Sequence, residues 1–183
     1  MGLVRIVLTG GECTGKSSLA QMAKERLGVP VSDEFAKEYA LHHSSRLLTL
    51  DDALPIGVGQ VSNLAHARKS ALEIGCPWYL ADTDLLSTEV YCQLLYGAKP
   101  EWLAALSLSE DESFYVLSSP KGIPWQDALE RRDASDRWQT FDAFRSLLQE
   151  RALAFEVLDQ PSLEERWLAF HAMIRALNLD SHS

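Results

Sequence analysis

The chain has 183 residues, of which 46% are hydrophobic and 23% are charged. That balance is typical of one soluble globular domain and excludes a disordered or fibrous protein. Seventeen Lys and Arg against 26 Asp and Glu give a formal charge of -9, and such a surface repels a nucleic acid backbone. Because no apolar stretch approaches the ~20 residues of a membrane helix and the N-terminus lacks signal-peptide features, we expect a cytoplasmic protein that binds neither nucleic acid nor membrane.

Five short apolar segments predict five strands, and segments of helical periodicity lie between them. The expected strands are 3–8, 29–32, 78–81, 114–117 and 154–158, and the expected helices are 16–27, 35–43, 58–74, 87–96, 140–151 and one that begins at the capping box 162–165. This alternation favours a single α/β domain with a five-stranded, mainly parallel sheet flanked by helices. We expect the domain to span 1–178, with a lid near 120–138 and a C-terminal tail at 179–183.

The segment between the first expected strand and the first expected helix carries the P-loop pattern GxxxxGK[ST]. It runs from Gly10 to Ser17, and its glycines let backbone N–H groups and the helix N-terminus face a polyphosphate. Lys16 is expected to bridge the β and γ phosphates of ATP, and the Ser17 hydroxyl to bind Mg²⁺. The expected nucleotide-binding residues are Gly11, Glu12, Cys13, Thr14, Gly15, Lys16, Ser17 and Ser18. Cys13 is a filler side chain or, as the less favoured alternative, a redox switch.

Acidic residues follow the second and third expected strands, at the edge where α/β sheets bind ligands. One acid is enough to order Mg²⁺, for which we name Asp82, and Asp84 can orient or deprotonate a substrate hydroxyl. Alternatively, one of the two caps the helix that begins near Ser87. Glu34 is the candidate general base, or else a first-turn acid that complements the dipole of the helix from Phe35.

A charge-dense stretch after the fourth expected strand holds Arg131, Arg132 and Arg137. Guanidinium groups that close over a transferring phosphoryl group promote that reaction, and Arg131 is our catalytic candidate. Any one of the three, taken alone, is more often a solvated surface charge. Tyr39 and Trp125 lie in segments suspected of binding, where they can stack on a substrate ring or pack in the core.

Several motifs, in this order, resemble the ribosylnicotinamide kinase domain of the NadR family. They are LTGGECTGKSS at 8–18, DEFAKEYA at 33–40, GQ at 59–60, ADTDL at 81–85 and PWQD at 124–127. The resemblance extends over about 4–174 and implies a five-stranded parallel sheet and the ATP-dependent phosphorylation of the 5′ hydroxyl of nicotinamide riboside. It also implies that Glu34, Asp82 and Asp84 lie near the riboside and the metal, and that the segment after Trp125 forms the lid. The expected substrate-binding residues are Asp33, Glu34, Tyr39, Gln60, Asp84 and Trp125.

The acceptor is a small molecule whose charge the sequence helps to define. Nicotinamide riboside has a fixed positive charge, so a pocket for it combines an aromatic face with carboxylates. Asp33, which stands where the family has an aromatic residue, joins Glu34, Phe35 and Tyr39 in supplying both. The alternative acceptor is a neutral nucleoside whose base donates hydrogen bonds to Asp33.

Two broader alternatives stay open at this point. One is another nucleoside or small-metabolite kinase on the same scaffold. The other is a regulatory ATPase that acts on a protein partner, because one fold supports both classes of function. The oligomeric state, a homo-oligomer included, is also open.

Overall fold

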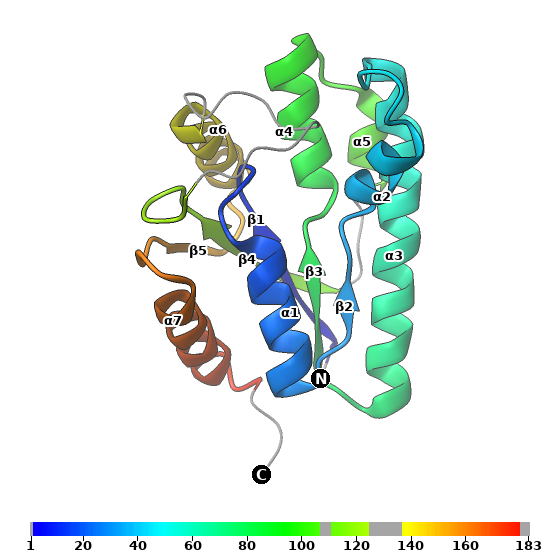
Figure 1. The fold of residues 1–183 in the computed structure, drawn as a ribbon. Helices are drawn as coiled ribbons and strands as arrows, with labels where there is room; N and C mark the ends of the chain where they lie inside the picture. The colour runs from blue at the N-terminus through cyan, green and yellow to red at the C-terminus, as the bar shows by residue number, and fades with distance from the viewer. Residues whose placement is uncertain (1, 107–110, 125–136, 180–183) are drawn as a thin grey trace.

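The computed structural model describes residues 2–106, 111–124 and 137–179. A sheet of five strands in the order β2-β3-β1-β4-β5 forms its centre, and every neighbouring pair is parallel (Figure 1). The strands are β1 (Val4–Thr9), β2 (Val31–Ser32), β3 (Trp78–Asp82), β4 (Glu112–Ser118) and β5 (Phe155–Leu158). The expected fold class is confirmed.

Helices cover both faces of this sheet (Figure 1). The long ones are α1 (Lys16–Leu27), α3 (Ala53–Ile74), α4 (Leu85–Tyr96), α6 (Arg137–Glu150) and α7 (Leu163–Ala176). The short ones are α2 (Phe35–His42), the 3-10 turn η1 (Leu50–Asp52) and α5 (Glu101–Leu106). Successive side chains of a strand point to opposite faces. Ile6 and Leu8 of β1 therefore pack with α1 and α7, and Val7 packs with α3, α4 and α6.

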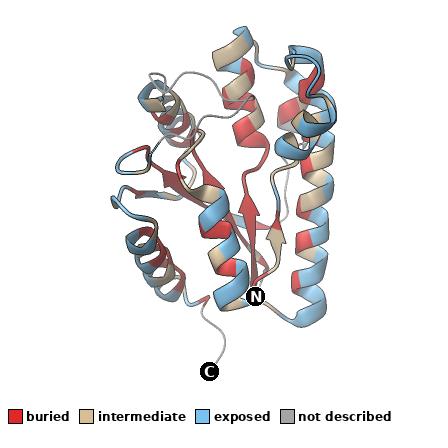
Figure 2. Cartoon of the chain, viewed as in Figure 1, coloured by how far each residue is buried: buried red, intermediate tan, exposed pale blue. Residues whose placement is uncertain are grey.

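Buried residues concentrate in the sheet and on the inward sides of the helices (Figure 2). Every residue of β3 is buried, as is usual for a parallel strand covered on both faces. Leu179, which we expected in the tail, is 3% exposed and packs with Phe170 and Ile174. The core on the α1 and α7 side therefore extends one residue into the expected tail.

Helix α3 differs most from its expected form. It begins at Ala53 rather than Val58, and Pro55 lies in its first turn, where a missing N–H costs no helical hydrogen bond. The helical spacing of the apolar residues in 58–74 predicts that Val58 and Leu72 face the core, but they are 52% and 55% exposed, whereas Gln60 is 2% exposed. This part of the prediction is wrong because Gln60 faces the polar ends of β2 and β3, which an apolar side chain could not satisfy.

Helices α1 and α7 follow their local signals closely. Helix α1 has the predicted bounds and ends at Gly28 with a φ of 65°. The capping box of Ser162 and Glu165 opens α7 as predicted. Helix α4 begins at Leu85 rather than near Ser87, and α5 was not predicted. Among the described helices, none combines the length and the apolar character needed to cross a membrane.

Candidate active site

The glycine-rich loop at 10–15 connects the end of the central strand β1 to the start of α1, as predicted. Gly10 has a φ of +124°, and a Cβ at this position would lie 2.6 Å from the backbone oxygen of Ser118. Only glycine tolerates both the dihedral angle and the close approach of β4. The backbone of the loop can therefore turn sharply beside the carboxyl end of the sheet.

Lys16 folds back over this loop. Its Nζ donates hydrogen bonds to the carbonyl oxygens of Gly10, at 2.9 Å, and Gly11, at 2.7 Å. The Thr14 hydroxyl also donates to Gly11 O, at 2.9 Å. Burial lowers the pKa of Lys16, and the carboxylates of Glu34 and Asp82 partly offset that effect. The ammonium is thus held at the loop, where it is attracted electrostatically by Glu34 and Asp82.

Arg166 of α7 fastens the loop from behind, and sequence reasoning missed it. Its side chain is 1% exposed and donates to the carbonyl oxygens of Thr14 at 2.8 Å, Lys121 at 2.7 Å and Gln160 at 2.8 Å. Burial lowers its pKa. No sequence signal identifies this residue, because an arginine in the first turns of an amphipathic helix is usually solvated.

Arg137 of α6 makes a second connection to the loop. It donates to the carbonyl oxygens of Cys13 at 2.8 Å and Ile123 at 2.9 Å. In a planar trans peptide the carbonyl of one residue points opposite to the N–H of the next. Since Arg137 and Arg166 hold the carbonyls of Cys13 and Thr14, the N–H groups of Thr14 and Gly15 point away from these arginines. Backbone N–H groups at a helix N-terminus are suited to phosphate oxygens.

Three of the predicted residues converge on one side chain that we did not predict, Lys37. Its Nζ lies 2.8 Å from Glu34 Oε2 and 3.5 Å from Asp82 Oδ2, and it also donates to the Ser17 hydroxyl. We call Ser17, Glu34, Lys37 and Asp82 the Lys37 cluster. Burial lowers the pKa of Lys37, but Glu34 and Asp82 raise it by more, so that it is raised overall. The signal in the sequence was the spacing of Glu34 and Lys37, which places both on one helix face.

Ser17 and Asp82 fit the role of magnesium ligands. Asp82 Oδ1 is buried and accepts no hydrogen bond from any described residue, so one oxygen remains for a cation. Mg²⁺ commonly binds one or two protein groups and takes its other oxygens from substrate phosphates and water. Within the described part of the chain, no group of three or more His, Cys, Asp or Glu could hold a metal by itself. The donor set therefore suits a cation that arrives with a phosphate.

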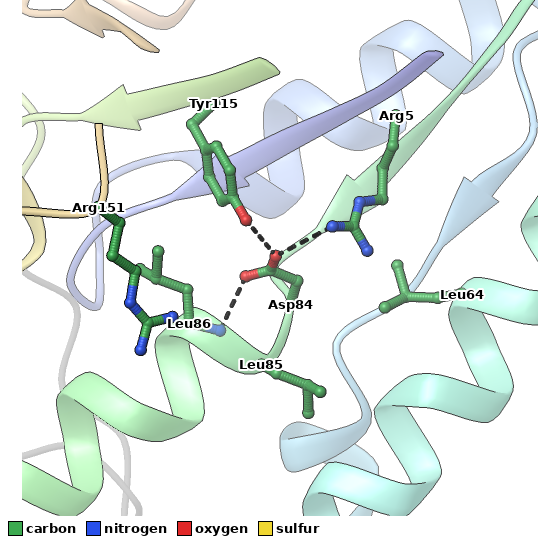
Figure 3. Close-up of a pocket in the computed structure, with 7 residues that line it drawn as sticks. All are labelled: Arg5, Leu64, Asp84, Leu85, Leu86, Tyr115 and Arg151. Carbon is green, nitrogen blue, oxygen red and sulfur yellow. Dashed lines mark hydrogen bonds and ion pairs between the residues drawn. The ribbon is translucent and has the colours of Figure 1, made fainter. Parts of the chain in front are cut away.

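Asp84 lies in different surroundings (Figure 3). Its Oδ1 accepts a hydrogen bond from the backbone N–H of Leu86 at 3.0 Å, which confirms the alternative that this residue caps the following helix. Its Oδ2 accepts one from the Tyr115 hydroxyl at 2.8 Å and lies 3.9 Å from Arg5 Nη2. Burial raises the pKa of Tyr115, and Asp84 raises it further, so the hydroxyl stays a donor. A role of Asp84 at a substrate hydroxyl stays a prediction.

The turn at Thr83 separates the two acids. Thr83 has a φ of 80°, which is rare for a β-branched residue. Its N–H donates to Leu8 O at 3.1 Å, and its hydroxyl donates to Ser87. These bonds hold a strained backbone, and strain of this kind is concentrated at functional sites.

Gln60 joins the ends of β2 and β3. Its Oε1 accepts from the N–H of Phe35 at 2.9 Å, and its Nε2 lies 3.3 Å from the Ser32 hydroxyl and from the carbonyl oxygens of Asp33 and Thr83. With these partners, a buried Gln60 positions the segment that carries Glu34. Its expected contact with substrate stays a prediction.

Gly59, the glycine that precedes Gln60, leaves space for the ring of Phe35. A Cβ at this position would lie 2.2 Å from an atom of the Phe35 ring. The absence of a side chain lets Phe35 pack against α3, directly beside the bond from Gln60 to the Phe35 N–H. The motifs at 33–40, 59–60 and 81–85 are therefore parts of one interlocked structure.

Tyr39 holds the connection between α2 and α3. Its hydroxyl donates to Asp52 at 2.8 Å, and its ring stacks on His43 with 4.0 Å between centroids. Arg46 binds both oxygens of Asp52 and holds the pKa of that carboxyl well below its usual range. Asp33, in contrast, is exposed at the end of β2. The acceptor contacts expected of Tyr39 and Asp33 stay predictions.

The remaining predicted residues are placed as follows. Glu34 is the N-cap residue of α2, but its carboxylate pairs with Lys37. Ser18, in the first turn of α1, is exposed. Trp125, Arg131 and Arg132 lie outside the described residues, as does most of the expected lid.

Comparison with known sequences confirms the resemblance expected from the motifs. A family model described as an AAA domain matches residues 5–166. The trifunctional NAD biosynthesis/regulator protein NadR is 23% identical in Escherichia coli (strain K12) and 22% identical in Salmonella typhimurium, over 177 residues in each case. Each match covers 94% of this chain and 42% of the relative. The chain thus spans less than half the length of these relatives.

Solved structures resemble the chain in fold. A NadR protein in complex with NR gives a TM-score of 0.71 at 19% identity, covering 99% of this chain and 52% of that one. A NadR protein in complex with NAD and AMP-PNP gives 0.67 at 20% identity, covering 94% and 49%. The thymidylate kinase from Ehrlichia chaffeensis gives 0.65 at 14% identity, covering 95% and 100%. These likenesses show that the fold is that of P-loop kinases.

Proposed function

The chain belongs to the AAA domain family, and we propose that it is an ATP-dependent kinase that phosphorylates the 5′ hydroxyl of nicotinamide riboside. One observation carries the proposal. The P-loop, Ser17, Glu34 and Asp82 come together at the carboxyl ends of β1, β2 and β3, where phosphate, metal and acceptor must meet for phosphoryl transfer.

Each residue has a part in this proposal. The loop N–H groups and Lys16 bind the β and γ phosphates, and Ser17 and Asp82 hold Mg²⁺. When bound, the metal neutralises charge on the phosphates. Glu34 accepts the proton of the acceptor hydroxyl while the hydroxyl oxygen forms a bond to the γ phosphorus. The bond between the γ phosphorus and the β-phosphate oxygen breaks, and ADP leaves. Lys37, 2.8 Å away, holds the Glu34 carboxylate in place.

The surroundings of Glu34 support a cationic acceptor. Asp33 presents an exposed carboxylate beside it, and the rings of Phe35 and Tyr39 lie 6.3 Å apart on α2. Carboxylates and aromatic faces both attract a pyridinium ring. The NadR structure bound to NR supports nicotinamide riboside as that acceptor.

A second candidate is a kinase for a neutral nucleoside or a nucleotide. The observation that favours it is the likeness to thymidylate kinase, which covers 95% of this chain. On this reading Asp33 accepts hydrogen bonds from a base rather than attracting a cation.

An acceptor panel tests the proposal. The chain is incubated with Mg·ATP and nicotinamide riboside, uridine, cytidine, thymidine or thymidylate, and ADP and phosphorylated acceptor are quantified by mass spectrometry. We expect phosphorylated nicotinamide riboside, formed with the highest kcat/KM of the panel. Uridine or thymidylate as the preferred acceptor would support the second candidate, whereas ADP without any phosphorylated acceptor would indicate a regulatory ATPase.

A matched pair of variants ties the activity to the loop. Lys16→Met removes the ammonium that serves the phosphates, so turnover should fall about a hundredfold or more. Lys69→Met removes the same charge from an exposed position on α3 and should leave turnover unchanged. Equal turnover in the two variants would contradict the assignment of the P-loop.

A further inference from the structure

The ammonium of Lys37 is surrounded by oxygen atoms from three separate elements. Ser17 comes from α1, Asp82 from β3, and Glu34 from the start of α2. An ammonium has three N–H donors, and among the described residues it has three oxygen partners: the Ser17 hydroxyl, Glu34 Oε2 at 2.8 Å and Asp82 Oδ2 at 3.5 Å. Lys37 is therefore held as a cation by these oxygens.

Two of these three partners are the groups that fit magnesium. A P-loop serine and a carboxylate at the end of the neighbouring strand hold Mg²⁺ in such proteins, and here both contact Lys37. An ammonium and a divalent cation repel each other at such distances and compete for the same oxygens. The two cations are therefore alternatives at this position.

Lys37 is also able to leave. Its side chain is 49% exposed, and a four-carbon stem lets the ammonium move while α2 stays in place. The Asp82 side chain, at 6% exposed, remains buried, and its Oδ1 accepts no hydrogen bond from the described residues. Asp82 thus stays in place and can bind a second cation after the ammonium of Lys37 has moved away.

We propose that Lys37 occupies, in the nucleotide-free site, the position that Mg²⁺ takes between Ser17 and Asp82 when nucleotide binds. This inference rests on the proposed function, because it needs a nucleotide that brings the metal. Without magnesium, Lys37 supplies the positive charge that the phosphates meet. With magnesium, the metal takes over, and Lys37 keeps only Glu34 of its three partners.

The proposal predicts that Lys37 changes how strongly Mg²⁺ increases the affinity of the protein for nucleotide. If Lys37 and Mg²⁺ are alternatives, Lys37 supports nucleotide binding in the absence of metal and adds little in its presence. We define the ratio as the nucleotide Kd without Mg²⁺ divided by the Kd with Mg²⁺. This ratio is therefore smaller in the wild type than in a variant that lacks the Lys37 ammonium.

Calorimetric binding of AMP-PNP, in EDTA and in excess Mg²⁺, tests this ratio with no acceptor and no turnover. We expect Lys37→Met to raise the ratio about tenfold or more, because binding weakens in EDTA and is retained with Mg²⁺. Lys37→Arg keeps a cation and Lys69→Met removes a distant one, so both should stay within about twofold of the wild type. Lys37→Ala serves as a second neutral variant, and thermal unfolding reports whether each variant folds.

The outcomes separate the two proposals. An unchanged ratio in folded Lys37→Met or Lys37→Ala overturns the role of Lys37 and leaves the kinase proposal intact. Equal weakening of AMP-PNP binding with and without Mg²⁺ is one form of this result, because Lys37 would then contact the phosphates whether or not the metal is bound. A raised ratio together with an inactive acceptor panel supports the role of Lys37 and removes only the kinase proposal. A wild type that binds no AMP-PNP in either condition overturns both.

Discussion

Asp82 and Asp84 are separated by one residue, yet their carboxylates have no described partner in common. Asp82 Oδ2 lies 3.5 Å from the ammonium of Lys37, which is 49% exposed. Asp84 Oδ2 accepts from Tyr115 at 2.8 Å and lies 3.9 Å from Arg5, within the core. The left-handed backbone of Thr83 sends the two side chains to these different places. The acid pair is thus divided between the Lys37 cluster and the buried surroundings of Tyr115 and Arg5.

The first prediction follows from this division. Asp84→Asn should lower the free energy of unfolding by about 2–4 kcal/mol, because it leaves Arg5 without this carboxylate and the Tyr115 hydroxyl without its acceptor, although Asn can still cap α4. Asp82→Asn should cost less stability but should lower turnover more, with a defect that added Mn²⁺ eases. Urea unfolding and kcat at several metal concentrations measure the two effects. The division is wrong if Asp84→Asn is as stable as the wild type and carries the metal-dependent defect.

The second prediction concerns the fit of Phe35 against Gly59. Gly59→Ala introduces a Cβ at 2.2 Å from the ring, and the displacement should cost about 1–3 kcal/mol of unfolding free energy. In a Phe35→Leu background the same change should cost less, since the ring that clashes is gone. A double-mutant cycle by urea unfolding measures the difference. Identical costs in the two backgrounds would show that Phe35 yields without strain.

The third prediction tests the support of the P-loop by Arg166. A lysine cannot reach the three carbonyls that the guanidinium binds, so Arg166→Lys should cost about 2–4 kcal/mol of stability. Because Thr14 O loses its donor, AMP-PNP binding should also weaken by about tenfold. Arg145→Lys, at an exposed ion pair on α6, is the control. Equal stability of the two variants would argue against this role.

The fourth prediction addresses the acceptor. If the acceptor is cationic, Asp33→Asn should lower kcat/KM for nicotinamide riboside about twofold to fivefold, the size expected of an exposed charge pair. The loss should shrink at high salt, because salt screens exposed charges, and uridine should be affected less. Asp142→Asn removes the same charge from α6 and is the control. Equal losses for the charged and neutral ribosides would favour the nucleoside alternative.

Much of the fold could be predicted because its signals are local. The P-loop and the bounds of α1 depend on consecutive residues, since glycine spacing and helix periodicity act within a few positions. The same is true of the capping box at Ser162 and of the apolar run in β3. The parallel sheet followed from the alternation of strands and helices, because such a crossover permits few topologies.

The allocation of the polar residues, in contrast, was decided by tertiary structure. Arg166 reaches a carbonyl 152 residues away, and Gln60 meets its partners only because β2 and β3 are neighbours in the sheet. Lys37 joins the site because α2 starts beside the ends of those strands. No sequence periodicity identifies the partner of a charged or amide side chain. The free energy of burying such a side chain depends on which atoms surround it in the fold. The sequence therefore determined where the P-loop forms, and only the folded chain decided which acid contacts Lys37 at the end of the sheet and which is held in the core by Tyr115 and Arg5.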